Sequence, residues 1–299
     1  MSHMLTLIAP PGGLATAQLT QARAALVALG ADAGTPAWLS PEEAADLPFA
    51  QLAPEQAMAA ARQALGDSAL DIIATPAEGR RKQLLLADMD STIVTSETLD
   101  ELAAFAGLKE KIAAITARAM NGELDFKSAL RERVGMLKGL STSALEATWQ
   151  ATELMPGALD LVGTMRAHGA RCVLVSGGFT FFTGKVAALV GFHAHFSNTL
   201  ELDGETLAGT VADPILDRDA KLATLKRIAG ELGLPLAATL TVGDGANDLA
   251  MIQAAGLGIA FHAKPSVAAA ARAKVDACGL RALLFAQGYT AAEITPYQG

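Results

Sequence analysis

Cysteine is scarce in this 299-residue sequence, in which only Cys172 and Cys278 occur. This scarcity excludes a disulfide-stabilised scaffold, and two distant thiols are typical of a reducing compartment. No uncharged apolar run reaches the roughly 20 residues that cross a bilayer. The first residues also lack the basic segment and apolar core of a secretory signal. We therefore expect a cytoplasmic protein that has no membrane partner.

Basic residues are also few, since 23 Lys and Arg face 31 Asp and Glu, for a formal net charge of −8. This balance, without a stripe of lysine and arginine, argues against a nucleic-acid partner. Hydrophobic residues make up 51% and charged residues 18%, which is typical of a globular chain rather than a disordered one. The length suits one large domain or two ordinary ones.

The first 80 residues predict a small α/β unit. Apolar runs at 5–10 and 70–76 are strand-like, the segments 14–30 and 54–66 have helical patterns, and one or two short strands fit between those helices. The resulting βαββαβ order resembles ACT-type, ferredoxin-like domains. Those domains often bind amino acids and pair with each other, so sensing of an amino acid or a homodimer is one hypothesis and a structural appendage is the other.

Residues 81–299 predict a second, larger α/β domain. Short apolar runs at 84–90, 172–178, 238–245 and 257–261 alternate with helical stretches, which indicates a doubly wound parallel sheet covered on both faces. The segment at about 95–156 is mostly helical and too long for a plain crossover. We expect it to be a cap over the strand ends, and we expect residues 198–211 to form a β-hairpin around an Asp-Gly turn.

Carboxylates follow two of these strands. Asp88 and Asp90 lie two residues apart, so in an extended chain their side chains point to the same face. Two carboxylates this close repel each other, which would raise the pKa of one of them or attract a cation. Asp244 ends another strand, and Asn247 and Asp248 follow it by about one helical turn. Because carboxyl ends of parallel strands meet at one rim, these oxygens should lie together. Oxygen ligands of this kind favour Mg²⁺.

Groups that bind phosphate are predicted at the same rim. Ser176 supplies a hydroxyl, and Gly177 and Gly178 supply backbone N–H groups near an expected helix start. Lys221 supplies a positive charge. Together with a metal, these groups would hold a phosphate dianion beside a carboxylate that can attack it.

The segments "DMDST", "VSGG", Lys221 and "GDGAND", in this order, resemble the four motifs of the haloacid-dehalogenase superfamily. The longer segments "DMDSTIVTSETLDELA", "LDFKSALRERVGMLKGL" and "VGDGANDLAMIQAAGLGIAFHAKP" are most similar to its phosphoserine phosphatase family. The resemblance covers about residues 82–285. It implies hydrolysis of O-phospho-L-serine, the last step of serine biosynthesis, through an aspartyl-phosphate.

The resemblance also implies roles for residues of the sheet domain. Asp88 would be the nucleophile and Asp90 the general acid and base, and Mg²⁺ would be held by the Asp88 side chain, the Asp90 backbone carbonyl and Asp244. The phosphoryl oxygens would be bound by Ser176, Gly177, Lys221 and Asn247. Asp248 would orient the lysine and the metal-bound waters, and Gly178 would support the phosphate loop.

The cap would select the substrate. By the same resemblance, Glu97 matches the residue that binds the substrate ammonium, and Arg133 matches the one that binds its carboxylate, where a guanidinium can bind in a bidentate manner. Phe126 and Met120 match apolar positions that exclude water. Arg131, two residues from Arg133, is expected to be a solvated surface residue.

Two alternative functions remain open. The first is a related phosphatase or phosphotransferase that acts on another small phosphomonoester. The second is a signalling protein that keeps an aspartyl-phosphate as a switch. Asp90 argues against the second, because an acid two residues after the nucleophile favours rapid hydrolysis of the intermediate.

Overall fold

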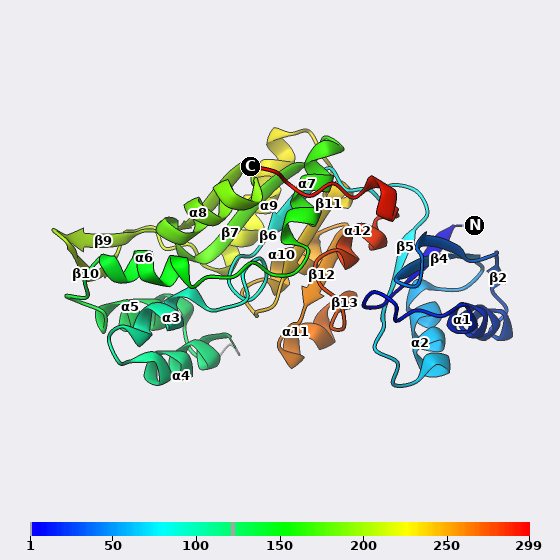
Figure 1. Cartoon of the computed structure of the whole chain (residues 1–299), viewed down its shortest axis with the longest axis horizontal. Coiled ribbons are helices and arrows are strands. Elements are labelled where there is room, and N and C mark those ends of the chain that lie inside the picture. The colour runs from blue at the N-terminus through cyan, green and yellow to red at the C-terminus, as the bar shows by residue number, and fades with distance from the viewer. Residues whose placement is uncertain (1, 121–122) are drawn as a thin grey trace.

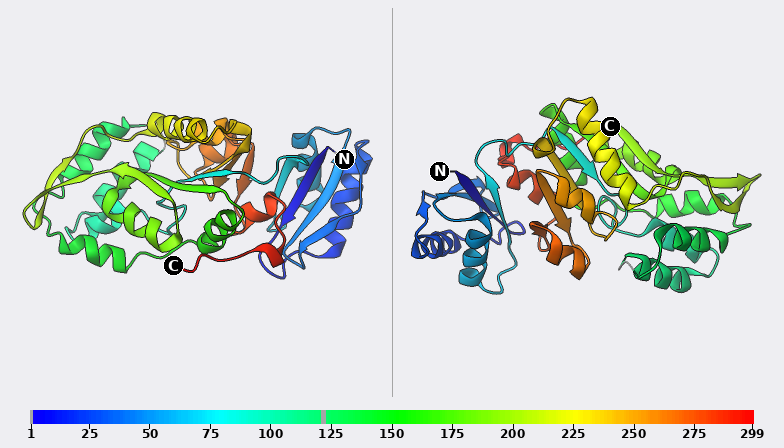
Figure 2. Two further views of the ribbon diagram at one scale, coloured as in Figure 1. Left: turned by 90° about the horizontal axis from the view of Figure 1, so that it is seen from above. Right: turned by 180° about the vertical axis from the view of Figure 1, so that it is seen from behind.

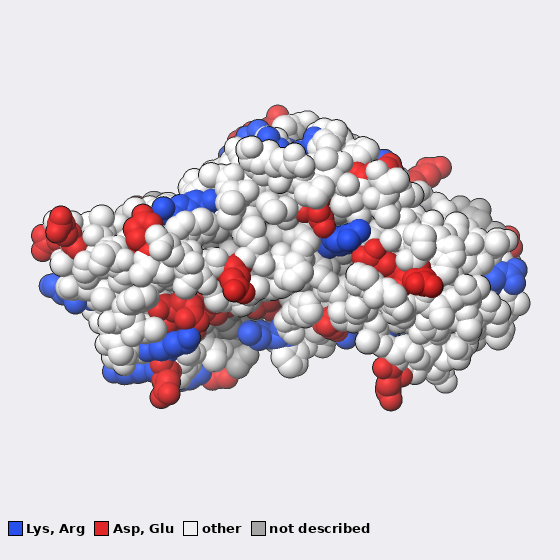
Figure 3. All heavy atoms as spheres, viewed as in Figure 1, with Lys and Arg blue, Asp and Glu red and all other residues white. Residues whose placement is uncertain are grey.

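The structure is a computed structural model that describes residues 2–120 and 123–299. Two α/β units lie side by side, with the N-terminal unit at one end of an elongated molecule (Figure 1). On the face in Figure 3, lysine and arginine side chains are interspersed with aspartate and glutamate. Among the helices of the described residues, none combines the length and apolar character that a membrane span requires.

The N-terminal unit is an antiparallel sheet with two helices packed on it. The sheet order is β2-β4-β1-β5, with β3 paired to β4. Its elements are β1 (His3–Ile8), α1 (Thr16–Ala28), β2 (Asp32–Ala33), β3 (Ala37–Ser40), β4 (Ala44–Ala50), α2 (Pro54–Leu65) and β5 (Asp71–Pro76). Three strands, rather than one or two, separate the helices. The extra strand, β2, has two residues, which is too short to show an alternating pattern.

The N-terminal sheet is buried on both faces. One face packs on α1 and α2 through residues such as Leu5, Leu47 and Phe49. On the other face, Ile8 and Ile73 belong to the apolar cluster of the larger unit. The Asp71 carboxylate accepts hydrogen bonds from the backbone N–H groups of residues 276–278, which lie in the larger unit. The two units are therefore joined by apolar packing and by hydrogen bonds as well as by the linker.

The larger unit is built on a six-stranded parallel sheet of order β13-β12-β11-β6-β7-β8. The strands are β6 (Leu84–Ala87), β7 (Arg171–Phe179), β8 (Ala194–Asn198), β11 (Thr239–Gly243), β12 (Leu257–Phe261) and β13 (Ala273–Val275). Both faces are covered, because Leu85 and Ala87 lie in one apolar cluster and Leu84 and Leu86 in another. This arrangement explains the uninterrupted apolar sequence of β6.

The helices of this unit lie on either side of the sheet (Figure 2). The covering elements are α7 (Ala158–Ala167), α8 (Thr180–Val190), α9 (Arg218–Glu231), α10 (Leu249–Ala254), α11 (Pro265–Ala270), α12 (Ala282–Ala286) and the short 3₁₀ helices Leu236–Ala238 and Ala291–Glu293. Strand order reverses between β6 and β11, because β7 and β8 follow on one side and β12 and β13 on the other. In doubly wound sheets, ligands bind at such a reversal, at the carboxyl ends of the strands.

Four helices between β6 and α7 form the predicted helical cap. They are α3 (Thr98–Ala104), α4 (Lys109–Met120), α5 (Phe126–Gly135) and α6 (Ser143–Gln150). The predicted hairpin is also present as β9 (Leu200–Asp203) and β10 (Thr206–Val211), and β10 packs against α5. Cap and hairpin lie together at the end of the molecule opposite the N-terminal unit (Figure 1). The predicted fold class, including the inserted cap, is confirmed.

A buried ion pair of the N-terminal unit lies where the two units meet. The Arg80 guanidinium bonds to the Asp46 carboxylate at 2.5 and 2.9 Å and to Thr6 Oγ1 at 3.0 Å, and it also reaches the backbone carbonyls of residues 285 and 286. The two side chains are only 10% and 11% exposed. Since removal of one partner leaves the other charge buried, this pair makes Arg80 sensitive to substitution.

We predict that Arg80→Met lowers the free energy of unfolding by about 3–5 kcal/mol, because Asp46 loses its cation. Replacing both partners in Arg80→Met/Asp46→Leu should recover most of that loss. The control is Arg81→Met, whose 45% exposed side chain pairs with Glu293 and which should cost about 1 kcal/mol or less. Denaturant unfolding measures all three. Equal losses for the Arg80 and Arg81 variants would contradict the prediction.

Candidate active site

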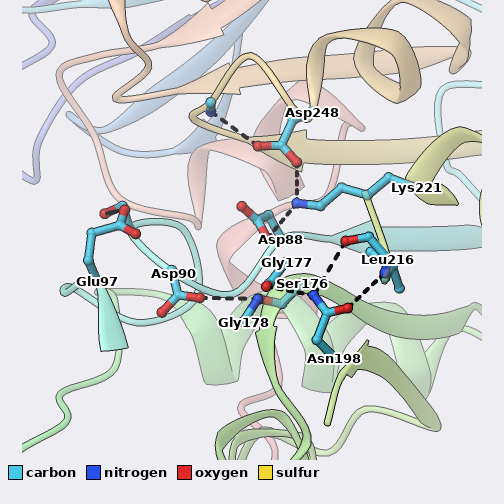
Figure 4. A network of polar contacts seen from close by, with 12 residues as sticks. Asp88, Asp90, Glu97, Ser176, Gly177, Gly178, Asn198, Leu216, Lys221 and Asp248 are labelled. Atoms are coloured by element: carbon cyan, nitrogen blue, oxygen red, sulfur yellow. Dashed lines mark hydrogen bonds and ion pairs between the residues drawn. The ribbon is translucent and has the colours of Figure 1, made fainter. Parts of the chain in front are cut away.

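Lys221 lies at the centre of the site, between two carboxylates. Its Nζ is 2.7 Å from Asp88 Oδ1 and 2.6 Å from Asp248 Oδ1, and all three side chains are buried (Figure 4). Asp88 follows β6, Lys221 lies in the first turn of α9, and Asp248 precedes α10. Burial lowers the pKa of Lys221, but Asp248 and Asp88 raise it more strongly, so the net shift is upward and the lysine stays charged.

Asp248 is fixed on both of its oxygens. While Oδ1 accepts from Lys221, Oδ2 accepts from the backbone N–H of Gly245 at 3.1 Å. Gly243 leaves room for this carboxylate, since a Cβ at that position would lie 2.3 Å from Asp248 Cγ. Asp248 therefore holds Lys221 beside Asp88, and the role predicted for it, to orient the lysine, stays a prediction.

Asp90 has different partners from Asp88. Its Oδ1 accepts from the backbone N–H of Thr98 at 2.8 Å, at the start of the cap, and its Oδ2 accepts from Ser176 Oγ at 3.1 Å. Burial raises the pKa of Asp90, and the hydrogen bonds from Thr98 and Ser176 oppose that shift. The pKa of Asp88 is raised well above its ordinary value, because burial and the nearby Asp248 outweigh the lowering effect of Lys221. The two neighbouring acids thus differ mainly in their contact with a cation.

The phosphate loop contains Ser176, Gly177 and Gly178 at the end of β7. These residues lie within the strand, because α8 begins only at Thr180. Ser176 Oγ accepts from the backbone N–H of Gly178 at 2.8 Å. A Cβ on Gly178 would lie 2.8 Å from Asp90 Oδ2, so only glycine allows this close approach. The backbone of the loop therefore faces Asp90 directly.

Asp244 lies beside this cluster with its charge unmatched by hydrogen bonds. Both of its carboxylate oxygens are buried and have no hydrogen-bond partner in the described residues, and its nearest recorded cation, Lys264 Nζ, is 3.9 Å away. Burial, and then Asp248, raise the pKa of Asp244 to about 7. One oxygen each from Asp88, Asp244 and Asp248 can lie within 4.8 Å of one another.

These oxygens fit a divalent cation. Buried carboxylate oxygens from two strand ends, of which those of Asp244 have no hydrogen-bond partner among the described residues, are the hard ligands that Mg²⁺ takes. Asp88 and Asp244 match the predicted metal ligands, whereas the third carboxylate in this cluster is Asp248 and the side chain of Asp90 is engaged by Thr98 and Ser176. The prediction from the sequence was that Asp90 binds Mg²⁺ through its backbone carbonyl, and such binding would leave the side chain available for these hydrogen bonds.

The cap brings its predicted residues to the same cavity. Glu97, Phe126 and Arg133 line a cavity of about 50 Å³, together with Asp88, Asp90, Ser176, Gly177, Gly178 and Asn247. Its small volume means that cap and strand ends nearly touch. The Phe126 ring lies over Gly177, where a Cβ would come within 2.8 Å of Cζ. Asn247 Oδ1 is buried without a hydrogen-bond partner among the described residues. The side chain of Met120 lies outside the described part of the chain.

Two charged groups of opposite sign face this cavity from the cap. The Glu97 carboxylate accepts a hydrogen bond from Ser91 Oγ at 2.8 Å. Burial, followed by the nearby Asp90 and Asp244, raises the pKa of Glu97 to about 8. Arg133 is only 5% exposed, and burial lowers the pKa of its guanidinium. By contrast, Arg131 lies on the surface, as expected, where it pairs with Asp213 at 2.9 Å.

Several residues that hold the site together were given no role from the sequence. Arg133 Nη1 donates to Thr116 Oγ1 at 2.8 Å, and Thr116 in turn donates to Asp100 Oδ1 at 2.8 Å. The backbone N–H of Thr98 fixes Asp90, as described above. The spacing of the polar positions on α3 and α4 could have indicated Asp100 and Thr116, because both interrupt apolar faces of the cap helices.

The family model for haloacid dehalogenase-like hydrolases matches residues 85–253. This match spans β6 through most of α10 and therefore includes every acidic residue of the strand-end cluster. The chain belongs to the haloacid dehalogenase-like hydrolases.

Within that family, the chain is similar to phosphoserine phosphatases. It is 42% identical over 203 residues to the Lactococcus lactis phosphoserine phosphatase, covering 68% of this chain and 94% of the relative. It is 40% identical over 238 residues to the Streptomyces coelicolor phosphoserine phosphatase, covering 80% of this chain but only 58% of the relative. The chain therefore spans less than two thirds of the length of the latter protein.

Solved structures show the same similarity. A haloacid-dehalogenase-family hydrolase from Salmonella enterica serovar Typhi has a TM-score of 0.82 at 29% identity, covering 95% of this chain and 97% of that one. A phospho-aspartyl intermediate analogue of phosphoserine phosphatase has a TM-score of 0.66 at 38% identity, covering 69% of this chain and 98% of that one. The first similarity extends over both units, including the N-terminal sheet.

We predict that Mg²⁺ binds more weakly as the pH falls below about 7. The raised pKa of Asp244 means that a proton occupies this carboxylate in acid and must leave before a metal binds, so affinity should drop up to about tenfold per pH unit. Calorimetric titration with MgCl₂ at pH 6, 7 and 8 measures this. Asp244→Asn should bind at least about tenfold more weakly, and Asp203→Asn, in the exposed hairpin turn, should match wild type. A pH-independent affinity would refute the prediction.

Proposed function

We propose that the protein is a Mg²⁺-dependent phosphoserine phosphatase that hydrolyses O-phospho-L-serine to L-serine and phosphate. One observation carries the proposal. The buried Asp88 pairs with Lys221, with 2.7 Å between Oδ1 and Nζ, and it lines a cavity that Glu97 and Arg133 also line from the cap. The first pair suits attack on a phosphoryl group. The second pair suits the ammonium and carboxylate of an amino acid. Similarity to phosphoserine phosphatases, including one solved as a phospho-aspartyl analogue, supports the assignment.

In the first step, an Asp88 oxygen attacks phosphorus and the bond from phosphorus to the serine oxygen breaks. Asp90, whose raised pKa favours the protonated form, donates its proton to that leaving oxygen. The product is serine and an aspartyl-phosphate on Asp88. Covalent catalysis of this kind divides one difficult displacement into two easier ones.

In the second step, a water molecule attacks the phosphorus of the aspartyl-phosphate. Asp90, now ionised, takes a proton from that water while the bond between phosphorus and the Asp88 oxygen breaks. Phosphate leaves, and both aspartates return to their starting states. The hydrogen bond from the Thr98 N–H keeps Asp90 directed at the cavity throughout, while the single Ser176 hydroxyl proton turns from Asp90 to a phosphoryl oxygen when phosphate is bound.

The phosphoryl oxygens are bound by Ser176, the backbone N–H of Gly177, Lys221 and Asn247. Such preorganised donors stabilise charge where it develops in the transition state. Asp88, the backbone carbonyl of Asp90 and Asp244 would hold Mg²⁺, with Asp248 beside them. When bound, the ion supplies positive charge that favours ionised Asp88 and neutralises the phosphate.

Substrate selection is assigned to the cap. Glu97 binds the ammonium, Arg133 the carboxylate, and Phe126 keeps water from the reacting atoms. The catalytic unit comprises residues 81–299, with the cap at about residues 95–156, and residues 1–80 form a separate accessory unit. Whether this unit senses serine or is a structural appendage stays a hypothesis, and a homodimer and a cytoplasmic location stay predictions.

Wild-type protein with MgCl₂ should release phosphate from O-phospho-L-serine, and removal of the metal with EDTA should abolish that release. Asp88→Asn lacks the nucleophilic charge and should lose at least about 1,000-fold in kcat. Because the amide has the same shape as the carboxylate, folding should be preserved, which circular dichroism checks. A variant that retains wild-type turnover would exclude Asp88 as the nucleophile.

Arg133→Ala tests the substrate against other phosphomonoesters. Loss of a buried group that binds the substrate carboxylate should lower kcat/KM for O-phospho-L-serine by about 100-fold or more. Hydrolysis of p-nitrophenyl phosphate, which has no such carboxylate, should change little. Arg131→Ala, two residues away and exposed, is the matched control and should resemble wild type with both substrates. Equal losses on both substrates would favour the alternative of a different small phosphomonoester.

A further inference from the structure

Asn198 is a buried residue at the end of β8 that belongs to none of the sequence motifs. It is 2% exposed and lies beside the end of β7, where Phe179 is its partner in the ladder. From the Val175–Phe196 pair to the Phe179–Asn198 pair, β7 advances four residues while β8 advances two. The two extra residues fall in the phosphate loop, which bulges out of the regular sheet.

The Asn198 side chain compensates for this bulge. Its Nδ2 donates to the carbonyl oxygen of Gly177 at 2.8 Å (Figure 4). A strand that bulges loses ladder hydrogen bonds, and the carboxamide supplies one from the neighbouring strand. Both polar groups of the peptide between Gly177 and Gly178 therefore have a partner. Asn198 binds its carbonyl oxygen, and Ser176 Oγ accepts from its N–H at 2.8 Å.

The same carboxamide also holds the segment that leads into α9. Asn198 Oδ1 accepts from the backbone N–H of Leu216 at 2.7 Å, and Nδ2 donates to the Leu216 carbonyl at 3.3 Å. The next residue, Asp217, caps α9 by accepting from the N–H groups of Asp219 and Ala220. Lys221 lies in that first helical turn, so the position of the lysine depends on this anchor.

Only asparagine satisfies all three bonds at this place. Two carbonyl oxygens require two N–H donors, and one backbone N–H requires an acceptor, which together match a carboxamide. An aspartate would offer no donors when ionised, and an alanine would leave all three backbone groups unpaired in a buried location. Chemistry, rather than volume, therefore explains asparagine here.

From these contacts we infer that Asn198 is a positioning residue, which aligns the phosphate loop and Lys221 on the same phosphoryl group. Among the described residues, those that line the cavity do not include Asn198, which acts through Gly177 on one side and through Leu216 and α9 on the other. The inference rests on the proposed phosphatase function, because it names the group on which the two segments converge.

The test compares the full-length variants Asn198→Ala and Asn198→Ser with Thr199→Ala, a control at the next, exposed position of the chain. Misplacement of phosphate-binding groups by a fraction of an ångström should lower kcat for p-nitrophenyl phosphate by about 10- to 100-fold in the Asn198 variants. Inorganic phosphate, measured by calorimetry with MgCl₂, should bind more weakly by about the same factor. Thr199→Ala should match wild type in both measurements.

A role confined to stability would give a different result. Folded Asn198 variants with a lower melting temperature, but with turnover and phosphate affinity within about twofold of wild type, would overturn the inference. Failure of both variants to fold would also overturn it, since Asn198 would then serve the fold. Wild-type protein that does not hydrolyse O-phospho-L-serine would refute the proposed substrate separately, because phosphate binding still decides the role of Asn198.

Discussion

The buried ion pair between Lys221 and Asp88 is the interaction on which the site depends. Five carboxylates, those of Asp88, Asp90, Glu97, Asp244 and Asp248, lie in or beside one cavity, and Lys221 is the cation that contacts two of them. Burial of an ion costs several kcal/mol unless an opposite charge offsets it. Burial first, and then this excess of negative charge, raises the pKa of Asp244 to about 7 and that of Glu97 to about 8. The cavity is therefore built to attract a cation before it can accept an anionic phosphate.

The strand order is what brings these charges together. Asp88 and Asp244 follow β6 and β11, the two strands between which the order reverses, and the chain departs from them in opposite directions. Because both loops leave the same rim, a gap opens between them that no crossover helix fills. The cap closes this gap from above. Apolar strands below and a helical insertion above exclude water, so each hydrogen bond in the site acts in a low-dielectric environment.

Much of this arrangement could be predicted from the sequence. Short apolar runs that end in polar residues predicted the parallel sheet, and the order of the motifs predicted which strand ends carry Asp88, Ser176 and Asp244. Contacts between segments that carry no pattern could not be predicted. Thr116 supports Arg133 through a side chain on a different cap helix, and Asn198 reaches two segments that are distant in sequence. β2 was also missed, because its two residues pair only through tertiary contacts with β4.

The roles proposed for the two neighbouring aspartates rest on their different partners rather than on sequence position. Asp88 contacts an ammonium group, which favours its ionised form, whereas Asp90 accepts only from a backbone N–H and a hydroxyl. Burial alone would favour protonation of both acids. The pKa of Asp88 is raised well above its ordinary value even with Lys221 beside it, because burial and Asp248 outweigh the lysine, so the proposed attack by ionised Asp88 depends on a bound cation as well. Gly178 allows Asp90 to approach closely, and Asp248 keeps Lys221 on Asp88. In the proposed mechanism the cations therefore act on Asp88, and Asp90, which is held by a backbone N–H and a hydroxyl, carries the proton.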